Sequence, residues 1–304
     1  MRVSVIIPTY QAAPYIAGLL RALQAQSHAP HEIMVMDSSS TDGTAAIVQQ
    51  AAIANVQFQV IPKTEFNHGG TRTRAAKRVT GDVLVFMTQD AQPANEHYLA
   101  ELIKPIMQHQ AVACFARQLP YPHASASEQF ARGFNYPAVS RINTQADVAT
   151  RGVKAYFYSD VASAIRSDIF WQMGGYADDV IISEDMLLAA KLLQQGYATA
   201  YVADAQVYHS HDYTFKQQFQ RYFDIGVFFK ARASDLAGAK TGGEGLRFAL
   251  SQLRFLCGGA HYGQALRVLG ELPLKWLGFR LGMWHSYLPL WLIKKCSMHS
   301  FYWS

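Results

Sequence analysis

Acidic side chains stand beside apolar runs or helical patterns in three parts of the sequence. Asp37 follows "EIMVM", Asp90 comes shortly after "DVLVFM", and Glu184–Asp185 opens "EDMLLAAKLL". A carboxylate at the carboxyl end of a parallel strand often holds a metal ion or a ligand. The first two acids are therefore candidates for holding a metal ion or a ligand, and the third stands at the start of an expected helix.

Each of these acids also has a structural explanation. Asp90 stands where the cap of the next helix is expected, and a serine before Glu184–Asp185 can cap a helix with an acidic first turn. The turn Ser40–Asp42 is adequately explained as a helix cap. Asp37 is harder to explain in this way, because it falls at the end of a strand, where ligands of such sheets bind.

Short apolar runs alternate with helical patterns through the first half of the chain. Strands are expected at "VSVII", "EIMVM", "VQFQVI" and the run that starts at Asp82, and helices at 16–26, 44–54, 71–78 and around 99–107. Strands that alternate with helices imply right-handed crossovers, and therefore a mainly parallel sheet. The expected fold class is α/β, Rossmann-like, with helices on both faces of the sheet.

The second half of the chain has a different texture. "YPHASASEQFARGFNYP" is expected to be rich in loops, and "SDVASAIRSDIF" to be a strand followed by the start of a helix. "SEDMLLAAKLLQQG" has the pattern of an amphipathic helix that ends at a glycine. A polar stretch rich in glycine, residues 237–245, separates these elements from a basic and aromatic final segment.

Composition and turn residues exclude several classes of protein. Half of the residues are apolar and 16% are charged, which is typical of a globular chain. The first strand is followed by "PTYQAAP", which lacks the glycines of the dinucleotide-binding turn. Three widely spaced cysteines indicate neither a disulfide framework nor a cysteine metal site, and fit a reducing cytosol. We expect no secretory signal peptide and no membrane-spanning helix, because no apolar run is long enough.

Four short motifs have to be considered together: "PTY", "DSSSTD", "TQDA" and "SED", in this order along the chain. The set resembles the family-2 inverting nucleotide-sugar glycosyltransferases of the GT-A fold, over roughly Val3 to Gly226. "FNHGGTR" with "FMTQDA" is most similar to the bacterial rhamnosyltransferase branch, whose usual donor is dTDP-L-rhamnose. The resemblance implies a GT-A domain at 1–236, with a nucleotide-sugar half at about 1–115 and an acceptor half at about 116–236.

The resemblance also implies which residues bind the donor. Thr9 and Tyr10 would line the nucleobase pocket, and Asp37 would accept the pyrimidine N3–H, so that UDP- and dTDP-sugars both fit. Arg72 would face the diphosphate, since a guanidinium suits phosphate oxygens, although it can also be a solvated arginine near a helix start. The full set of expected donor-binding residues is Pro8, Thr9, Tyr10, Asp37, Ser39, His68, Gly69, Arg72, Gln89 and Asp90.

Family members usually carry an Asp-X-Asp triplet where this chain has Thr88-Gln89-Asp90. Only the last acid remains, but Mg²⁺ or Mn²⁺ needs few protein ligands when a diphosphate and water supply the others. His209 and His211 alternate on an expected strand end and would be further metal ligands. Two histidines in this position can equally be packed or solvated.

The resemblance implies Asp185 as the general base and Glu184 as a supporting or acceptor-binding residue. A single inverting displacement needs a base for the acceptor hydroxyl and a cation for the departing diphosphate, and no covalent intermediate. The residues expected to close over donor and acceptor are Trp171, Gln218, Arg221 and Tyr222. The last three resemble the Gln-x-x-Arg-Trp element of processive relatives, and otherwise belong to an ordinary apolar helix stripe.

The final segment, 237–304, is expected to be a helical, amphipathic tail. From Leu246 onward it carries seven basic residues against Glu271 alone, interleaved with tryptophan and phenylalanine. This composition suits the plane of an anionic membrane, and alternatives are a helical subdomain, a homo-oligomer contact or a nucleic-acid module. We expect no nucleic-acid partner and a cytoplasmic protein at the inner face of the membrane.

The expected reaction is transfer of L-rhamnose from dTDP-rhamnose to a lipid-linked or polysaccharide acceptor. Transfer from a UDP-hexose is the alternative within the same class. The reduced triplet at Thr88–Asp90 also leaves open a nucleotide-sugar-binding subunit without catalytic activity.

Overall fold

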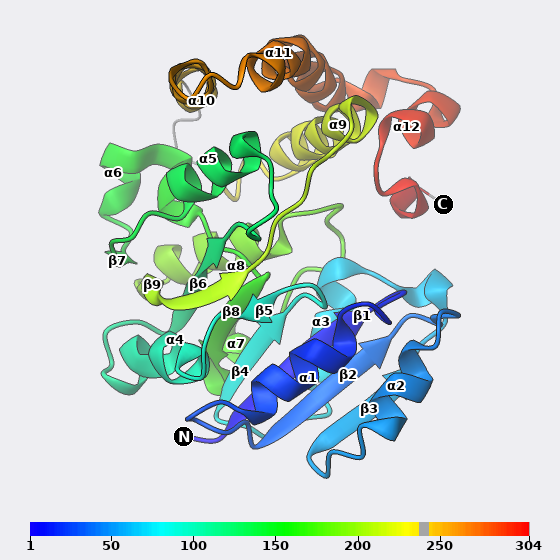
Figure 1. Cartoon of the computed structure of the whole chain (residues 1–304), viewed down its shortest axis with the longest axis vertical. Coiled ribbons are helices and arrows are strands. Elements are labelled where there is room, and N and C mark those ends of the chain that lie inside the picture. Colours follow the sequence, from blue (N-terminus) through cyan, green and yellow to red (C-terminus); the bar gives the residue numbers. More distant parts are fainter. Residues whose placement is uncertain (237–242, 304) are drawn as a thin grey trace. The chain divides into compact units, whose positions relative to one another are not determined.

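The computed structural model describes residues 1–236 and 243–303, and Figure 1 shows their path. The chain forms two compact units, each made of separate stretches. The first unit consists of Met1–Leu119, Tyr136–Asp178 and Glu184–His209. The second unit consists of Pro120–Asn135, Asp179–Ser183 and the described residues from Ser210 on. Residues 237–242, where the tail was expected to begin, lie outside the described residues. The expected division into 1–236 and 237–304 stays a prediction.

A nine-stranded sheet forms the centre of the first unit. Its strands are β1 (Val3–Thr9), β2 (Glu32–Asp37), β3 (Val56–Val60), β4 (Val83–Met87), β5 (Gln92–Pro93), β6 (Ala113–Leu119), β7 (Arg141–Asn143), β8 (Ala162–Arg166) and β9 (Thr199–Tyr208). The order across the sheet is β3-β2-β1-β4-β8-β6-β9-β5, and β7 also pairs with β9. Neighbours from β3 to β4 run parallel, whereas β8 runs antiparallel to both β4 and β6.

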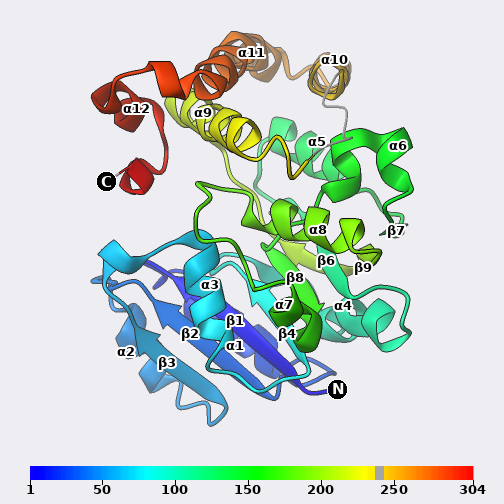
Figure 2. The same cartoon turned by 180° about the vertical axis from the view of Figure 1, so that it is seen from behind.

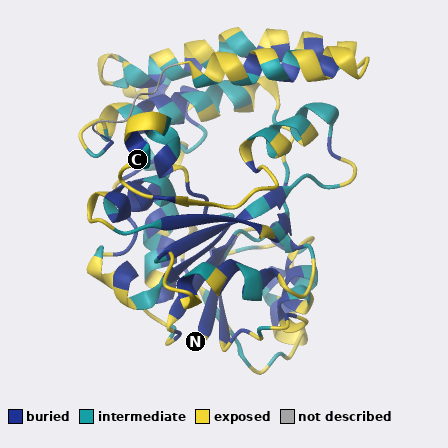
Figure 3. Cartoon of the chain, turned by 90° about the vertical axis from the view of Figure 1, so that its left-hand side faces the viewer, coloured by how far each residue is buried: buried dark blue, intermediate teal, exposed yellow. Residues whose placement is uncertain are grey.

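Helices cover both faces of this sheet, as the alternating pattern predicted. The helices of this unit are α1 (Ile16–Gln24), α2 (Thr44–Gln50), α3 (His68–Ala76), α4 (Tyr98–Met107), α6 (Asp147–Arg151), α7 (Ser167–Gln172) and α8 (Glu184–Gln194), and its 3₁₀ turns are η1 (Lys63–Glu65) and η2 (Gly152–Tyr156). The core on one face joins Val3, Val5 and Ile7 to α1, α2 and α4 (Figure 1). The core on the other face joins Ile6 to α3, α7 and α8 (Figure 2). Figure 3 shows the buried strands between them. The α/β fold class is confirmed.

Helix α3 begins at His68, three residues before the helix that the sequence predicted at 71–78. Its cap is Asn67, whose side-chain oxygen accepts the Gly70 N–H at 2.8 Å. Gly69 lies in the first turn, where a Cβ atom would come within 2.1 Å of the Ala177 carbonyl oxygen. Glycine is therefore required for α3 to approach that loop, and this packing outweighs the low helix propensity of glycine.

The second unit is helical. It contains α5 (Ala126–Asn135), α9 (Phe215–Ala231), α10 (Glu244–Gly258), α11 (Tyr262–Met283), α12 (Leu290–Cys296) and the 3₁₀ turns η3 (His285–Tyr287) and η4 (Ser300–Trp303). The loop-rich expectation was wrong over α5. Its rings pack against α10, with Phe134 and Phe248 centroids 5.1 Å apart. This stabilisation comes from a distant part of the chain, and local sequence does not reveal it.

Glycines let α9 and α11 pack with their backbones in close contact. A Cβ atom on Gly278 would lie 2.5 Å from the Phe219 carbonyl oxygen, and one on Gly282 would lie 2.0 Å from the Phe223 carbonyl oxygen. Gly226 of α9 faces α11 in the same way, 2.3 Å from the Phe279 carbonyl oxygen. Among residues 1–236 and 243–303, no helix combines the length and the apolar character needed to cross a membrane.

We predict that Gly282→Ala destabilises the second unit, because the added methyl group meets the Phe223 carbonyl oxygen. Overpacking of this kind costs about 1–3 kcal/mol, which urea unfolding measures. Gly263→Ala in the same helix is the matched control, since nothing lies within 4 Å of its added Cβ. The control should be neutral or stabilising by up to about 1 kcal/mol. Equal stability of Gly282→Ala and the control would refute the close packing.

Candidate active site

The direction of the strands brings six chain segments to one edge of the sheet. The parallel strands β1, β2 and β4 end at this edge. Strand β8 starts there, since its first residue, Ala162, pairs with Met87 at the end of β4. Strands β6 and β9 run parallel to each other and antiparallel to β8, so both also end there. We call this side the carboxyl edge, and ligands of α/β sheets bind at such an edge.

Asp37 is buried at the carboxyl edge and is held by its neighbours. Its Oδ1 accepts from Thr9 Oγ1 at 2.9 Å and from Ser40 Oγ at 2.6 Å, and its Oδ2 accepts from the Ser40 N–H at 2.7 Å. Only 1% of Asp37 is exposed. A carboxylate has about four acceptor sites, so these three bonds leave room for one more donor. Asp37 thus organises the end of β2 and retains one acceptor site.

Tyr10 is fixed by two residues from other segments. Its backbone N–H donates to Gln89 Oε1 at 2.7 Å, and Gln89 Nε2 donates to the Tyr10 carbonyl at 3.0 Å. Lys63 Nζ donates to the Tyr10 hydroxyl at 2.6 Å and lies 4.3 Å from the ring centroid. This hydrogen bond lowers the pKa of the Tyr10 hydroxyl. Gln89 therefore joins the loop after β4 to the loop after β1.

Two further expected donor residues flank this loop. Pro8 lies within β1, opposite Met36. Ser39 adopts a left-handed backbone (φ 59°), and its hydroxyl donates to the Ile61 carbonyl at 2.8 Å. Its side chain thus connects the turn after β2 to the end of β3.

Asp90 and His209 face each other at the carboxyl edge. His209 Nε2 lies 3.6 Å from Asp90 Oδ2, and the His209 Nδ1 atom lies 2.9 Å from Gln118 Oε1. Gln118 is itself held, because its Nε2 donates to Tyr136 Oη and Ser159 Oγ. With Nδ1 engaged by Gln118, the Nε2 atom is directed at Asp90, the arrangement that metal-binding histidines commonly show.

The residues present fit a divalent cation. A carboxylate oxygen and an imidazole nitrogen suit Mn²⁺. The buried hydroxyl of Thr88, at the first triplet position, has no hydrogen-bond partner. Strand β9 ends at Tyr208, so the expected strand alternation does not reach His209 and His211. His211 belongs to the second unit, where its N–H donates to Glu128 Oε1 at 3.3 Å.

Arg72 is buried in an ion pair rather than solvated. Its Nη1 lies 2.9 Å from Glu184 Oε1 and also donates to the His68 carbonyl at 2.9 Å. Its Nε lies 3.8 Å from Asp160 Oδ2. Only 6% of Arg72 and 6% of Glu184 are exposed. The interaction joins the second turn of α3 to the first residue of α8. A role of Arg72 toward the diphosphate stays a prediction.

Asp185 follows Glu184 in the first turn of α8 and is part-buried. Its Oδ1 accepts the Met186 N–H at 2.7 Å, and its Oδ2 accepts the Asp160 N–H at 3.1 Å. Burial raises the pKa of Asp185 to about 8, and the charges of Asp160 and Glu184 act in the same direction. A carboxylate with such a pKa is a stronger proton acceptor than an ordinary aspartate, as a general base requires.

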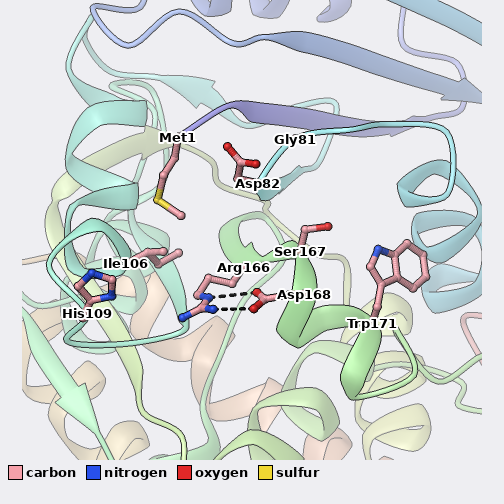
Figure 4. Close-up of a pocket in the computed structure, with 9 residues that line it drawn as sticks. All are labelled: Met1, Gly81, Asp82, Ile106, His109, Arg166, Ser167, Asp168 and Trp171. Atoms are coloured by element: carbon pink, nitrogen blue, oxygen red, sulfur yellow. Dashed lines mark hydrogen bonds and ion pairs between the residues drawn. The ribbon is translucent and has the colours of Figure 1, made fainter.

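Trp171 lies at the opposite edge of the sheet. Strand β8 ends there, because Arg166 pairs with Val83 at the start of β4, and α7 follows directly. Trp171 lines a cavity of about 530 Å³ with residues from the starts of β1 and β4 (Figure 4). Since β8 is antiparallel to β4, a residue after β8 is taken away from the carboxyl edge. Trp171 is therefore not among the residues that the structure brings together.

The other residues expected to close the site lie in α9, in the second unit. The Arg221 guanidinium lies 5.6 Å from the centroid of the Tyr213 ring, and Lys275 Nζ lies 5.8 Å from that of Tyr222. Gln218 begins the second turn, with its N–H donating to the Thr214 carbonyl. Their closing role stays a prediction.

Three residues of this edge were not found from the sequence: Lys63, Gln118 and Asp160. Lys63 stands in a short turn after β3, and Gln118 is an ordinary polar position within β6. Asp160 directly precedes the apolar run of β8, and an acid beside an apolar run is also the pattern that identified Asp37 and Asp90. Asp160 stands before its strand rather than after it, and β8 begins at the carboxyl edge, so the pattern of an acid after an apolar run does not identify it.

Comparisons with known proteins agree with this architecture. The sequence profile of "Glycosyl transferase family 2" matches residues 4–174, and that of "Glycosyl transferase family group 2" matches residues 95–294. The chain is 37% identical over 308 residues to the O-antigen chain rhamnosyltransferase RfbN of Salmonella typhimurium, covering 100% of this chain and 96% of RfbN. It is 38% identical over 306 residues to the O-antigen chain rhamnosyltransferase WbaN of Salmonella anatum, covering 99% and 95%.

Solved structures show the same fold. The structure of S. aureus TarS 1-349 in complex with UDP-GlcNAc matches with a TM-score of 0.61 and 19% identity, covering 98% of this chain and 84% of that chain. The mannosyltransferase PcManGT from Pyrobaculum calidifontis, in complex with GDP-Man and Mn²⁺, matches with a TM-score of 0.58 and 19% identity, covering 99% and 84%. The GT-A fold is thereby confirmed. The chain belongs to glycosyl transferase family 2 and is an inverting glycosyltransferase that uses a nucleotide-sugar donor.

Proposed function

We propose that this enzyme transfers L-rhamnose from dTDP-rhamnose to a glycan acceptor carried on a lipid, as a step of O-antigen synthesis. The observation that carries the proposal is the full-length similarity to two O-antigen chain rhamnosyltransferases. A match over the whole chain includes the second half, which contributes acceptor-binding segments in the expected domain arrangement.

The nucleobase is held by the loops after β1 and β2. Tyr10, kept in place by Gln89 and Lys63, offers its ring to the base, and the remaining acceptor site of Asp37 takes the pyrimidine N3–H. Thymine and uracil present the same N3–H donor. The contact with Asp37 therefore does not distinguish a UDP-hexose donor from dTDP-rhamnose, and an activity assay is needed to decide between them.

Asp90 and His209 would hold a divalent cation, Mg²⁺ or Mn²⁺, and Gln118 keeps the imidazole in position. His211 stands two residues beyond His209 along the chain and is the further expected ligand. When bound, the cation neutralises charge on the departing diphosphate. Asp185 takes the proton of the acceptor hydroxyl, and Glu184 is held beside it by Arg72.

We predict that Asp185→Asn lowers kcat for rhamnose transfer by about 10²–10⁴-fold, the usual contribution of a general base. Binding of dTDP, measured by calorimetry, should change little, because the nucleobase contacts lie on other segments. Mass spectrometry with dTDP-rhamnose, UDP-sugars and lipid extracts measures the product. Asp168→Asn is the control, since this acid pairs with Arg166 at the opposite edge.

Normal turnover by Asp185→Asn would show that Asp185 is not the general base. Faster transfer from a UDP-hexose than from dTDP-rhamnose would establish the alternative donor. If the wild-type protein bound nucleotide sugar but released no nucleotide with any acceptor, the silent binding subunit would be the better description.

We predict that Asp90→Asn and His209→Ala each weaken Mn²⁺ binding by about 10-fold or more, because each removes a ligand. The free Mn²⁺ signal in electron paramagnetic resonance measures binding directly, without reference to activity. His109→Ala is the control, since His109 lines the cavity at the opposite edge. Unchanged Mn²⁺ affinity in both ligand variants would place the cation elsewhere.

The second unit presents a surface that suits an anionic membrane. In α11, Tyr262, Leu266, Leu269 and Trp276 recur at helical spacing and are between 50% and 69% exposed. The opposite side of the helix is buried (Figure 3, top). Basic residues accompany these apolar side chains on α10, α11 and α12: Arg247, Arg254, Arg280, Lys294 and Lys295. We propose that this surface lies on the inner face of the membrane, where a lipid-linked acceptor is found.

We predict that the protein sediments with vesicles that contain phosphatidylglycerol more strongly than with neutral vesicles, and less strongly at high salt. Leu266→Ala with Trp276→Ala should reduce the bound fraction severalfold, because both side chains lose buried apolar area in the lipid. Trp171→Ala is the control for loss of a tryptophan. Binding to neutral and anionic vesicles alike, or binding of DNA without lipid, would contradict this surface.

A further inference from the structure

Three carboxylates and one cation share a buried cluster of the first unit. The acids are Asp160, Glu184 and Asp185, and the cation is the Arg72 guanidinium. One guanidinium balances a single negative charge. Because burial disfavours unbalanced charge, the three acids cannot all be ionised as easily as in water. The protonation states of these acids therefore depend on one another.

Asp160 is the most firmly held of the three acids. Its Oδ1 accepts from Ser163 Oγ at 2.6 Å and from Tyr176 Oη at 2.7 Å. Its Oδ2 lies 3.8 Å from Arg72 Nε, and only 2% of the residue is exposed. Two hydroxyl donors and a guanidinium favour the charged form of this carboxylate. The proposed sugar transfer, with Asp185 as the base, assigns no role to the Asp160 carboxylate.

Asp160 also contacts Asp185 through its backbone. The Asp160 N–H donates to Asp185 Oδ2 at 3.1 Å, while the Met186 N–H holds Oδ1 at 2.7 Å. The orientation of the Asp185 carboxylate is thus set from two sides. This contact exists because β8 starts at the carboxyl edge, so that the turn before it meets the first turn of α8.

We propose that Asp160 is a positioning residue for proton transfer, which aims the Asp185 carboxylate through its backbone and makes it a stronger base through its side-chain charge. The proposal rests on the proposed function, in which Asp185 takes the acceptor proton. Arg72 limits the influence of Asp160 on Asp185, because it balances part of the Asp160 charge. Ser163 and Tyr176 maintain this influence by stabilising the ionised form of Asp160.

The pKa values of the two acids agree with this arrangement. Burial raises the pKa of Asp160 to about 6, and Arg72 opposes that rise. Burial raises the pKa of Asp185 to about 8, and the charge of Asp160 is the next contribution. The pKa of Asp160 thus stays below that of Asp185, so Asp160 is the first of the two to ionise as the pH rises. The remaining groups that act on Asp185 are Glu184 on α8, Arg72 on α3 and Tyr158 before β8.

Asp160→Asn in the full chain tests the proposal. It keeps the backbone N–H and removes only the charge, so the pKa of Asp185 falls. The acid limb of the pH profile of kcat/KM should move to lower pH by about half a unit or more. The rate on the plateau should fall about threefold, because a weaker base takes the proton less readily. Asp168→Asn, at the opposite edge, should leave the acid limb in place.

Tyr176→Phe is the second variant, and it tests the same charge even if Asp160→Asn does not fold. It removes one donor to Asp160 while filling the same space, which raises the pKa of Asp160 and weakens its charge near neutral pH. The acid limb should move in the same direction by a smaller amount. An acid limb that stays in place in these variants, whatever the loss of rate, would overturn the proposal.

Failure of the proposed function would look different. If Asp185→Asn still transferred sugar, the base assignment itself would be wrong. If Asp185→Asn were inactive and Asp160→Asn kept the wild-type pH profile, only the role of Asp160 would be lost.

Discussion

The ion pair between Arg72 and Glu184 is the interaction on which the catalytic arrangement depends. It joins the second turn of α3 to the first turn of α8, two helices far apart in the sequence. Both side chains are almost fully buried, so loss of either one would leave a charge without its partner. Asp185 follows Glu184 directly, and its position is therefore set by this pair. Gly69 supports the same arrangement, because it lets α3 approach the loop at Ala177.

Strand β8 provides the second constraint. It is inserted antiparallel between β4 and β6, so its start lies beside the ends of these two strands, at the edge where β1 and β2 also end. The turn before β8 thereby brings Asp160 beside Asp185. The same reversal takes Trp171 to the other edge. The direction of β8 thus places Asp160, which precedes the strand, at the carboxyl edge, and Trp171, which follows it, at the opposite edge.

The features of the fold and of the candidate site that depend on local sequence pattern could be predicted from the sequence alone. The strands and helices of the first half are periodic, and the α/β fold with Asp37 and Asp90 follows from where each run ends, whereas Asp185 follows from the resemblance to family-2 glycosyltransferases. An apolar run does not reveal the direction of its strand, so the sequence could not predict that Asp160 belongs to the site or that Trp171 lies at the opposite edge. Helix α5 was missed for a related reason, since its stability comes from rings of α10. The ion pair of Arg72 requires knowledge of α8, which lies more than a hundred residues away.

The central claim is that Asp185 takes the acceptor proton, and chemical rescue tests it most directly. Asp185→Gly removes the carboxylate and leaves a space that formate can enter. If Asp185 is the base, rhamnose transfer by this variant should be very slow and should rise with formate concentration, while the wild-type rate stays constant. Transfer by Asp185→Gly at the wild-type rate without formate would contradict the claim.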